Sequence, residues 1–267
     1  MNATIFRHVV RQHRLRLLVV ATALTGWGTL MPIVYATFGV QMQDIVSQFP
    51  ALQQYMHFGG GDMFTLSGSI AVGYIHPIAI ALLAVFAIAF PLSGVAGERQ
   101  RGTLEIVLAR PVSRRSYYVT LLVAAVLFIG LAVAATLIGT VIAAAAVNVL
   151  DQLKLENLPL LWLNGVVLYF AIAAISFAAS VSFDRIGPAA GIALAIVLVA
   201  YALEIIGSLW PDAAWLQPYS LFHYLQPDLV LREGLQVFDT ALLLVVGGAA
   251  VIYALIVFPR RDLAAPT

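Results

Sequence analysis

The sequence predicts an all-α protein whose chain crosses a membrane six times. Of its 267 residues, 62% are apolar and only 10% are charged, and the mean hydropathy is +0.96. Soluble domains carry about 25% charged residues, so this chain lacks the polar surface that a water-soluble domain needs. It also contains long runs almost free of charge, and about 20 helical residues cross the hydrocarbon core of a bilayer. We therefore expect a single transmembrane domain over 1–267, with spans at about 17–37, 70–91, 118–144, 160–182, 188–210 and 239–258.

The distribution of basic residues predicts which side of the membrane each end faces. If the N-terminus is inside, the inner segments hold 12 Lys and Arg and the outer segments hold 2. Basic residues are enriched on the cytoplasmic side of membrane proteins. We therefore predict a multi-pass protein of the cell membrane with both termini in the cytoplasm, and we expect its source to be bacterial or archaeal. The net charge of +1 argues against nucleic acid as a partner.

Two segments outside the expected spans look organised. Residues 1–16 place Arg7, Arg11 and Arg14 on one face of a helix, which predicts an interfacial helix with its arginines toward anionic head groups. The alternative is a basic flank that only anchors the topology. Residues 211–238 contain three prolines and are too apolar for an ordinary loop. We expect an outer re-entrant segment of broken helices, whose backbone must be covered by protein.

The segment between the second and third spans predicts a short helix at 103–110. Gly102 interrupts the preceding helix, Thr103 can cap a new one, and Pro111 stops it. One face of this helix is apolar, and it carries Leu104, Val107 and Leu108. Two turns are not stable alone, so this face must pack against something. It rests either on head groups and its own spans or in a groove of a partner protein. Arg99, just before it, is expected to be exposed.

The same segment carries a resemblance to a known family. Glu98–Arg115 reads ERQRGTLEIVLARPVSRR and resembles the signature of ATP-binding-cassette (ABC) exporter permeases of the type-2 class. In that family this loop is the coupling helix, gripped by a separate ATPase subunit. Members of the family are similar to this chain as we expect it to fold, because they have a basic N-terminal helix, six spans and re-entrant helices before the last span. The resemblance implies that ATPase coupling involves Glu98, Arg101, Thr103, Leu104, Glu105, Val107, Leu108 and Arg110.

The resemblance also implies a function for the chain. It would be a permease subunit that exports an unknown, hydrophobic substrate by alternating access. No Gly-x-x-x-x-Gly-Lys-[Ser/Thr] phosphate loop occurs, so this chain is expected to bind no cofactor, with ATP and Mg on the partner ATPase. Six spans imply a second permease copy or a paralogue. Small-residue ladders could pack helices within or between copies, namely Ala135, Gly139 and Ala143, and Gly187, Gly191 and Ala195.

Other classes of function find weaker support in the sequence. The chain has no cysteine, and its five histidines form no His-Glu-x-x-His motif, so we predict no catalytic and no metal site. Met56, His57 and Met63 could offer soft ligands to copper, or could be simple loop residues. The main alternative is a six-helix secondary transporter, although such proteins typically carry several intramembrane charges. A purely structural membrane protein would leave the segment at 98–115 unexplained.

One charged residue, Glu204, falls inside an expected span. His76 lies at nearly the same depth in the second span, and Pro77 beside it frees the carbonyl of Gly73. In the family that the chain resembles, the second and fifth spans line the translocation path. One interpretation is therefore a polar pair of His76 and Glu204 near an outer gate. The other is an interfacial glutamate that reaches water and a histidine bonded to local backbone.

Overall fold

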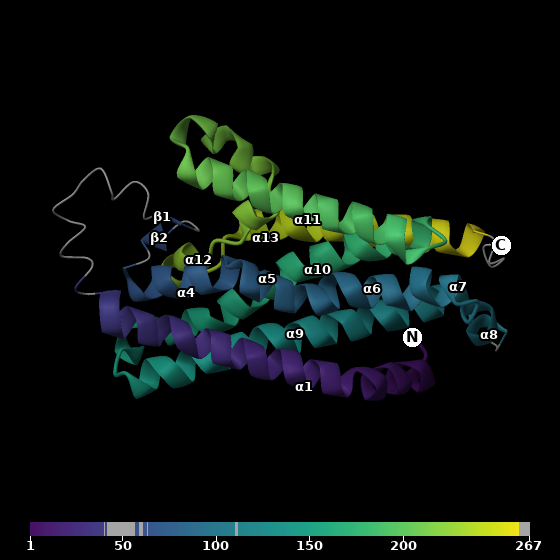
Figure 1. The fold of residues 1–267 in the computed structure, drawn as a ribbon, viewed down its shortest axis with the longest axis horizontal. Coiled ribbons are helices and arrows are strands. Elements are labelled where there is room, and N and C mark those ends of the chain that lie inside the picture. The colour runs from purple at the N-terminus through teal and green to yellow at the C-terminus, as the bar shows by residue number, and fades with distance from the viewer. Residues whose placement is uncertain (40, 42–56, 59–60, 63, 110–111, 262–267) are drawn as a thin grey trace.

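The computed structural model describes residues 1–39, 41, 57–58, 61–62, 64–109 and 112–261. Its helices lie side by side in an elongated bundle (Figure 1). Six helical stretches are long and apolar enough to cross a membrane, and they overlap all six predicted spans: Ala3–Gly39, Pro77–Gln100, Arg114–Ala146, Leu155–Ser182, Ile186–Leu209 and Val237–Arg260. The all-α class and the six spans are thus confirmed.

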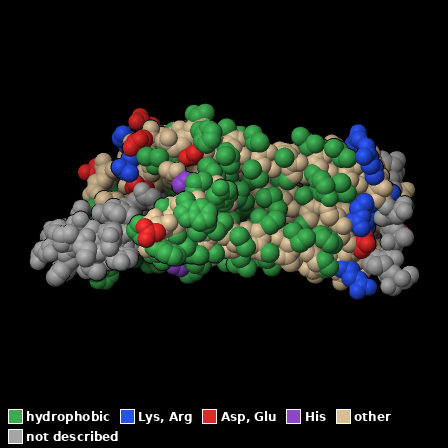
Figure 2. All heavy atoms as spheres, turned by 90° about the horizontal axis from the view of Figure 1, so that it is seen from above, with side chains coloured by type: hydrophobic (Ala, Val, Ile, Leu, Met, Phe, Trp, Pro, Cys, Tyr) green, Lys and Arg blue, Asp and Glu red, His purple; other side chains and the backbone are tan. Residues whose placement is uncertain are grey.

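The two ends of the bundle differ in charge. Both termini lie at one end, called here the termini end, together with α7 (Glu98–Gln100) and α8 (Leu104–Leu108). The opposite end, called the loop end, holds α12 (Pro227–Glu233) and the two-residue strands β1 (His57–Phe58) and β2 (Gly61–Asp62). Figure 2 shows Lys and Arg gathered at the termini end, apolar side chains along the middle, and most of the visible Asp and Glu at the loop end.

The first helix is longer than expected. α1 runs without interruption from Ala3 to Val34 and continues into the π-helical turn η1 (Tyr35–Gly39). The expected separate helix at 1–16 is therefore not seen as such, because its residues are the first turns of α1. The reason is visible in the sequence, since neither glycine nor proline occurs between Ala3 and Thr25 and nothing breaks the hydrogen-bond ladder.

α1 packs closely along α9 (Arg114–Ala146) through two glycines. A Cβ atom on Gly28 would lie 2.1 Å from the carbonyl oxygen of Thr136, and one on Gly139 would lie 2.1 Å from that of Thr25. Two hydroxyls bond across the interface, because Thr25 Oγ1 donates to the carbonyl of Ala135 (3.2 Å) and Thr140 Oγ1 donates to that of Gly28 (3.3 Å). Gly139, which belongs to the small-residue ladder of the third span, thus packs against a helix of the same chain.

The second span is broken into pieces. α4 (Leu66–Ile75) ends at His76, whose backbone is extended, and a new helix begins at Pro77. Proline cannot donate to the preceding turn and favours an extended residue before it. The span then continues as α5 (Pro77–Ala84), η2 (Val85–Ala89), α6 (Phe90–Leu92), η3 (Ser93–Gly97) and α7, with π-helical geometry in η2 and η3.

The remaining spans surround α10 (Leu158–Ser182). This helix contacts α9, α11 (Ile186–Leu209) and α13 (Val237–Arg260), as well as the pieces of the second span. Two short 3₁₀ turns, η4 (Leu150–Gln152) and η5 (Leu155–Asn157), join α9 to α10 at the loop end.

The segment between α11 and α13 is helical but broken, as the sequence predicted. It forms η6 (Pro211–Tyr219), η7 (Phe222–Tyr224) and α12. Two asparagine side chains, one in η5 and one in α10, bond to this segment. Asn157 Nδ2 donates to the carbonyl of Leu231 (3.0 Å), and Asn164 Nδ2 donates to that of Tyr224 (3.3 Å). The re-entrant depth of 211–238 in a bilayer stays a prediction.

Candidate functional site

The turn at 98–109 projects from the termini end, and its first residues are bonded to one another. The Glu98 carboxylate accepts a hydrogen bond from Thr103 Oγ1 (2.5 Å) and forms an ion pair with Arg101. The backbone N–H of Thr103 donates to the carbonyl of Glu98 (3.0 Å). Gly102 reverses the chain with φ of +69°, a conformation that favours glycine. Glu98, Arg101 and Thr103, three of the expected coupling residues, therefore fix the shape of the turn.

The helix that follows buries Leu104 and exposes Ile106, a residue that the predicted apolar face did not include. α8 spans only Leu104–Leu108, and Leu104 is 1% exposed because its side chain joins the core of the bundle. Of the two places expected for the apolar face, Leu104 therefore takes the one against the chain's own spans. Ile106 is instead 68% exposed, and Glu105 and Ala109 on either side of it are also exposed. The side chains of Val107, Leu108 and Arg110, the other expected coupling residues, lie outside the part that the structure describes.

Behind this turn lies an ion cluster that sequence reasoning missed. Arg99 is 1% exposed, not an exposed cation as expected, and its Nη1 donates to Asp184 Oδ1 (3.1 Å) in the connection between α10 and α11. Arg261, just after α13, donates to the same oxygen (2.9 Å). A second tie joins these parts, because Gln100 Oε1 accepts from the backbone N–H of Ile186 (2.9 Å). The cluster fastens the turn to the ends of the fourth, fifth and sixth spans.

Toward the loop end, the His76 side chain contacts the backbone of its own span and a ring of α1. Its Nδ1 accepts from the backbone N–H of Ile78 (3.3 Å), and its ring stacks on that of Trp27 with centroids 4.7 Å apart. Trp27 Nε1 also donates to the carbonyl of Gly73 (2.8 Å). This is the carbonyl that Pro77 was expected to free, and α1 supplies its partner.

Glu204 belongs to a second polar group between the fifth and sixth spans. It is 8% exposed, accepts from Gln217 Nε2 (3.1 Å), and lies 3.8 Å from His223 Nδ1. Burial lowers the pKa of His223, and the Asp239 carboxylate opposes this by raising it. No contact among the described residues joins His76 to Glu204. The structure thus places these two candidate pathway residues in separate polar groups.

No group of three His, Asp or Glu side chains lies close enough to hold a metal ion in the part of the chain that the structure describes. The methionines of the copper alternative, Met56 and Met63, and the side chain of His57 lie outside that part.

Comparison with known proteins gives one family. The family described as ABC-2 family transporter protein matches residues 6–263. A comparison with curated proteins gave no match.

Proposed function

Because the chain belongs to the ABC-2 transporter family, we propose that it is the permease subunit of an ABC exporter. It forms the transmembrane pathway, and a separate ATPase subunit binds ATP and Mg and drives efflux. The match to the family over 6–263, together with six apolar helices, carries this proposal. The substrate is not defined by the residues described, and its hydrophobic character is an analogy with the family.

We place the termini end in the cytoplasm. Of the 14 Lys and Arg, 12 lie in segments that would be cytoplasmic in this orientation, and most of the Lys and Arg visible in Figure 2 lie at this end of the bundle. This asymmetry supports the orientation, because Lys and Arg are retained on the inner side of a membrane. It also brings the turn at 98–109 to the side where ATP is available.

The ATPase would grip this turn through its exposed residues. Ile106 is a large apolar side chain that is 68% exposed on a cytoplasmic helix, and a protein groove could bury it. Full burial of such a side chain contributes about 1.5–3 kcal/mol. Leu104, anchored in the core of the permease, would carry the movement of this turn into the bundle.

A second permease copy, identical or a paralogue, would complete the pathway. Gly139 is already used inside the chain, but a Cβ atom on Gly187 or Gly191 would meet nothing within 4 Å. The same helix exposes Leu198 and Val199. This open face of α11 is where we place the second copy, because small residues let two helices approach closely in a membrane.

The test uses two substitutions within one turn of helix. Ile106→Glu should leave the permease folded, because the side chain is exposed, but should release the ATPase and uncouple ATP hydrolysis from transport. Leu104→Glu should destabilise the permease itself, because it places a carboxylate in the core. Ile106→Met, which keeps an apolar side chain, is the control and should retain the ATPase.

Co-purification of the ATPase and ATP hydrolysis by the complex in vesicles, with and without a panel of hydrophobic test compounds, provide the measurements. A stoichiometric ATPase and full transport with Ile106→Glu would show that this turn is not the coupling element. If no ATPase co-purifies with the unaltered permease, the alternative of a secondary transporter replaces the proposal.

A further inference from the structure

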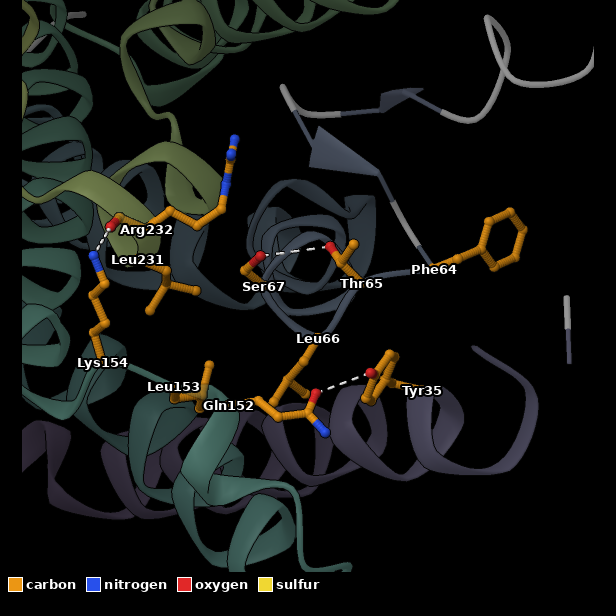
Figure 3. A pocket seen from close by; sticks show the side chains of 10 residues that line it. All are labelled: Tyr35, Phe64, Thr65, Leu66, Ser67, Gln152, Leu153, Lys154, Leu231 and Arg232. Carbon is orange, nitrogen blue, oxygen red and sulfur yellow. Dashed lines mark hydrogen bonds between the residues drawn. The ribbon is translucent and has the colours of Figure 1, made fainter. Parts of the chain in front are cut away.

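A cavity of about 510 Å³ lies at the loop end, and the described residues that line it include neither the turn at 98–109 nor Glu204. Figure 3 shows that its walls come from segments far apart in the sequence: the start of η1, the start of α4, the connection between α9 and α10, and the end of α12. Tyr35 and Gln152 close one side through a hydrogen bond between Tyr35 Oη and Gln152 Oε1 (2.9 Å). Thr65 and Ser67 contribute hydroxyl groups to another wall.

The cavity brings together the two basic residues of the loop end. Lys154, the single lysine of the chain, and Arg232 are the 2 cations that the outer segments hold, and both line this cavity. Lys154 Nζ donates to the backbone carbonyl of Arg232 (2.7 Å). An ammonium group has three N–H donors, so this bond leaves two of them for another acceptor. Residues 78 positions apart in sequence thus meet at one wall, and Figure 3 shows the Arg232 guanidinium pointing away from the Lys154 ammonium group.

The charges around the cavity favour an anion. Among the described residues that line it are both cations and no Asp or Glu. Arg232 is paired with the buried carboxylate of Asp228 (2.6 Å), which fixes its guanidinium while leaving its side chain 55% exposed. Lys154 has no ion pair within 4.0 Å among the residues that the structure describes. Its charge is therefore the one that a bound anion would neutralise.

Two further features narrow the chemistry of that anion. α4 begins at the cavity, with Thr65 as its N-cap and Leu66 and Ser67 as its first residues, and the start of a helix favours phosphate and carboxylate groups. The rest of the lining is apolar, from Phe64, Leu66, Leu153 and Leu231. An anion with an apolar part next to it fits this combination better than a small, fully hydrated ion does.

We propose that this cavity binds the phosphate group of an anionic amphiphile, with Lys154 as the main contact and Arg232 and the start of α4 beside it. The loop end is where the head groups of one leaflet lie, so an anionic phospholipid of that leaflet is one source of this phosphate. A soluble phosphate ester is the other. The proposal concerns a site on this chain alone, and it does not depend on the ATPase.

The experiment measures binding to the purified, delipidated permease by native mass spectrometry, without ATPase or nucleotide. Phosphatidylglycerol and the zwitterionic phosphatidylcholine are the two lipid probes, and glycerol 3-phosphate is the soluble competitor. Lys154→Gln removes the exposed cation of the cavity, and Lys154→Arg keeps it. Arg260→Gln, which removes an exposed cation at the termini end, is the control for the same change in net charge.

We expect the unaltered permease to bind one phosphatidylglycerol more tightly than phosphatidylcholine. Lys154→Gln should weaken this binding about tenfold, the size of one charge-assisted hydrogen bond, whereas Lys154→Arg and Arg260→Gln should retain it. Displacement of the lipid by glycerol 3-phosphate would identify a soluble ester as the ligand, and resistance to displacement would identify the lipid. Equal binding of the two lipids, or unchanged affinity in a folded Lys154→Gln variant, would overturn the proposal.

Discussion

The contact between α1 and α9 can be tested with a single methyl group. Gly28→Ala would place a Cβ atom 2.1 Å from the carbonyl oxygen of Thr136, and Gly139→Ala would place one equally close to that of Thr25. A carbon atom and a carbonyl oxygen approach to about 3.3 Å at closest. The two helices would therefore have to separate by roughly 1.2 Å at this point. Neither neighbour can turn away, because both atoms belong to helix backbones.

The expected loss of stability follows from three contributions. Overpacking of this kind costs about 1–3 kcal/mol. Separation also stretches the hydrogen bonds of Thr25 and Thr140 across the interface, each worth about 0.6 kcal/mol in a membrane. Alanine has a higher helix propensity than glycine, which offsets this loss of stability by about 1 kcal/mol. Either substitution should therefore lower the free energy of unfolding by about 1–3 kcal/mol.

The matched control lies two residues away. A Cβ atom on Gly26 would meet nothing within 4 Å, so Gly26→Ala should leave stability unchanged or raise it by up to about 1 kcal/mol. Equilibrium unfolding in mixed micelles with increasing SDS measures all three variants. If Gly28→Ala and Gly26→Ala unfold at the same SDS fraction, the close approach of the two backbones is not as the structure has it.

Three other predictions concern topology, the ion cluster and pH. Because the chain has no cysteine, Glu156→Cys should react with an impermeant maleimide on intact cells and Ser113→Cys only after lysis, and the reverse pattern would contradict the orientation. Asp184→Asn should lower the free energy of unfolding by about 1.5–3 kcal/mol, because buried Arg99 loses its carboxylate; an unchanged unfolding midpoint would mean that the cluster contributes nothing. Burial lowers the pKa of His223 from 6.5 in the folded protein. As the pH falls through 6.5, this histidine is therefore protonated in the unfolded chain before it is protonated in the folded protein, which favours unfolding. Thermal stability should therefore decrease from about pH 7 to pH 5, and less so for His223→Gln; an equal decrease in both proteins would assign the effect to other groups.

Much of the fold was predictable because a membrane imposes strong local requirements. An uncharged apolar run of sufficient length has few alternatives to a spanning helix, and all six predicted spans overlap observed ones. The effect of Pro77 was also predictable, since a missing N–H acts on a carbonyl four residues away. The hydrogen-bond donor to that carbonyl, Trp27, was not predictable, because it lies 46 residues from Gly73 in sequence.

Which face of the turn at 98–109 is buried could not be predicted for the same reason. A helix of five residues shows too few positions for its periodicity to identify the buried face, and the rotation set at Gly102 turns Leu104 inward and Ile106 outward. Arg99 looked exposed because charged residues usually are. Its partner Asp184 is 85 residues away, so no local pattern reveals the pair. Pairwise contacts between distant helices decide these details.

In mechanical terms, the second span consists of two stiff helical parts joined at His76. A continuous helix resists bending and twisting because each turn is bonded to the next, but the extended backbone of His76 interrupts that ladder. The part nearer the loop end, α4, is seated against α12 and α1, and the other part packs on α10 and ends in the turn at 98–109. The torsion angles of His76 are therefore where this span bends most easily when force is applied at that turn.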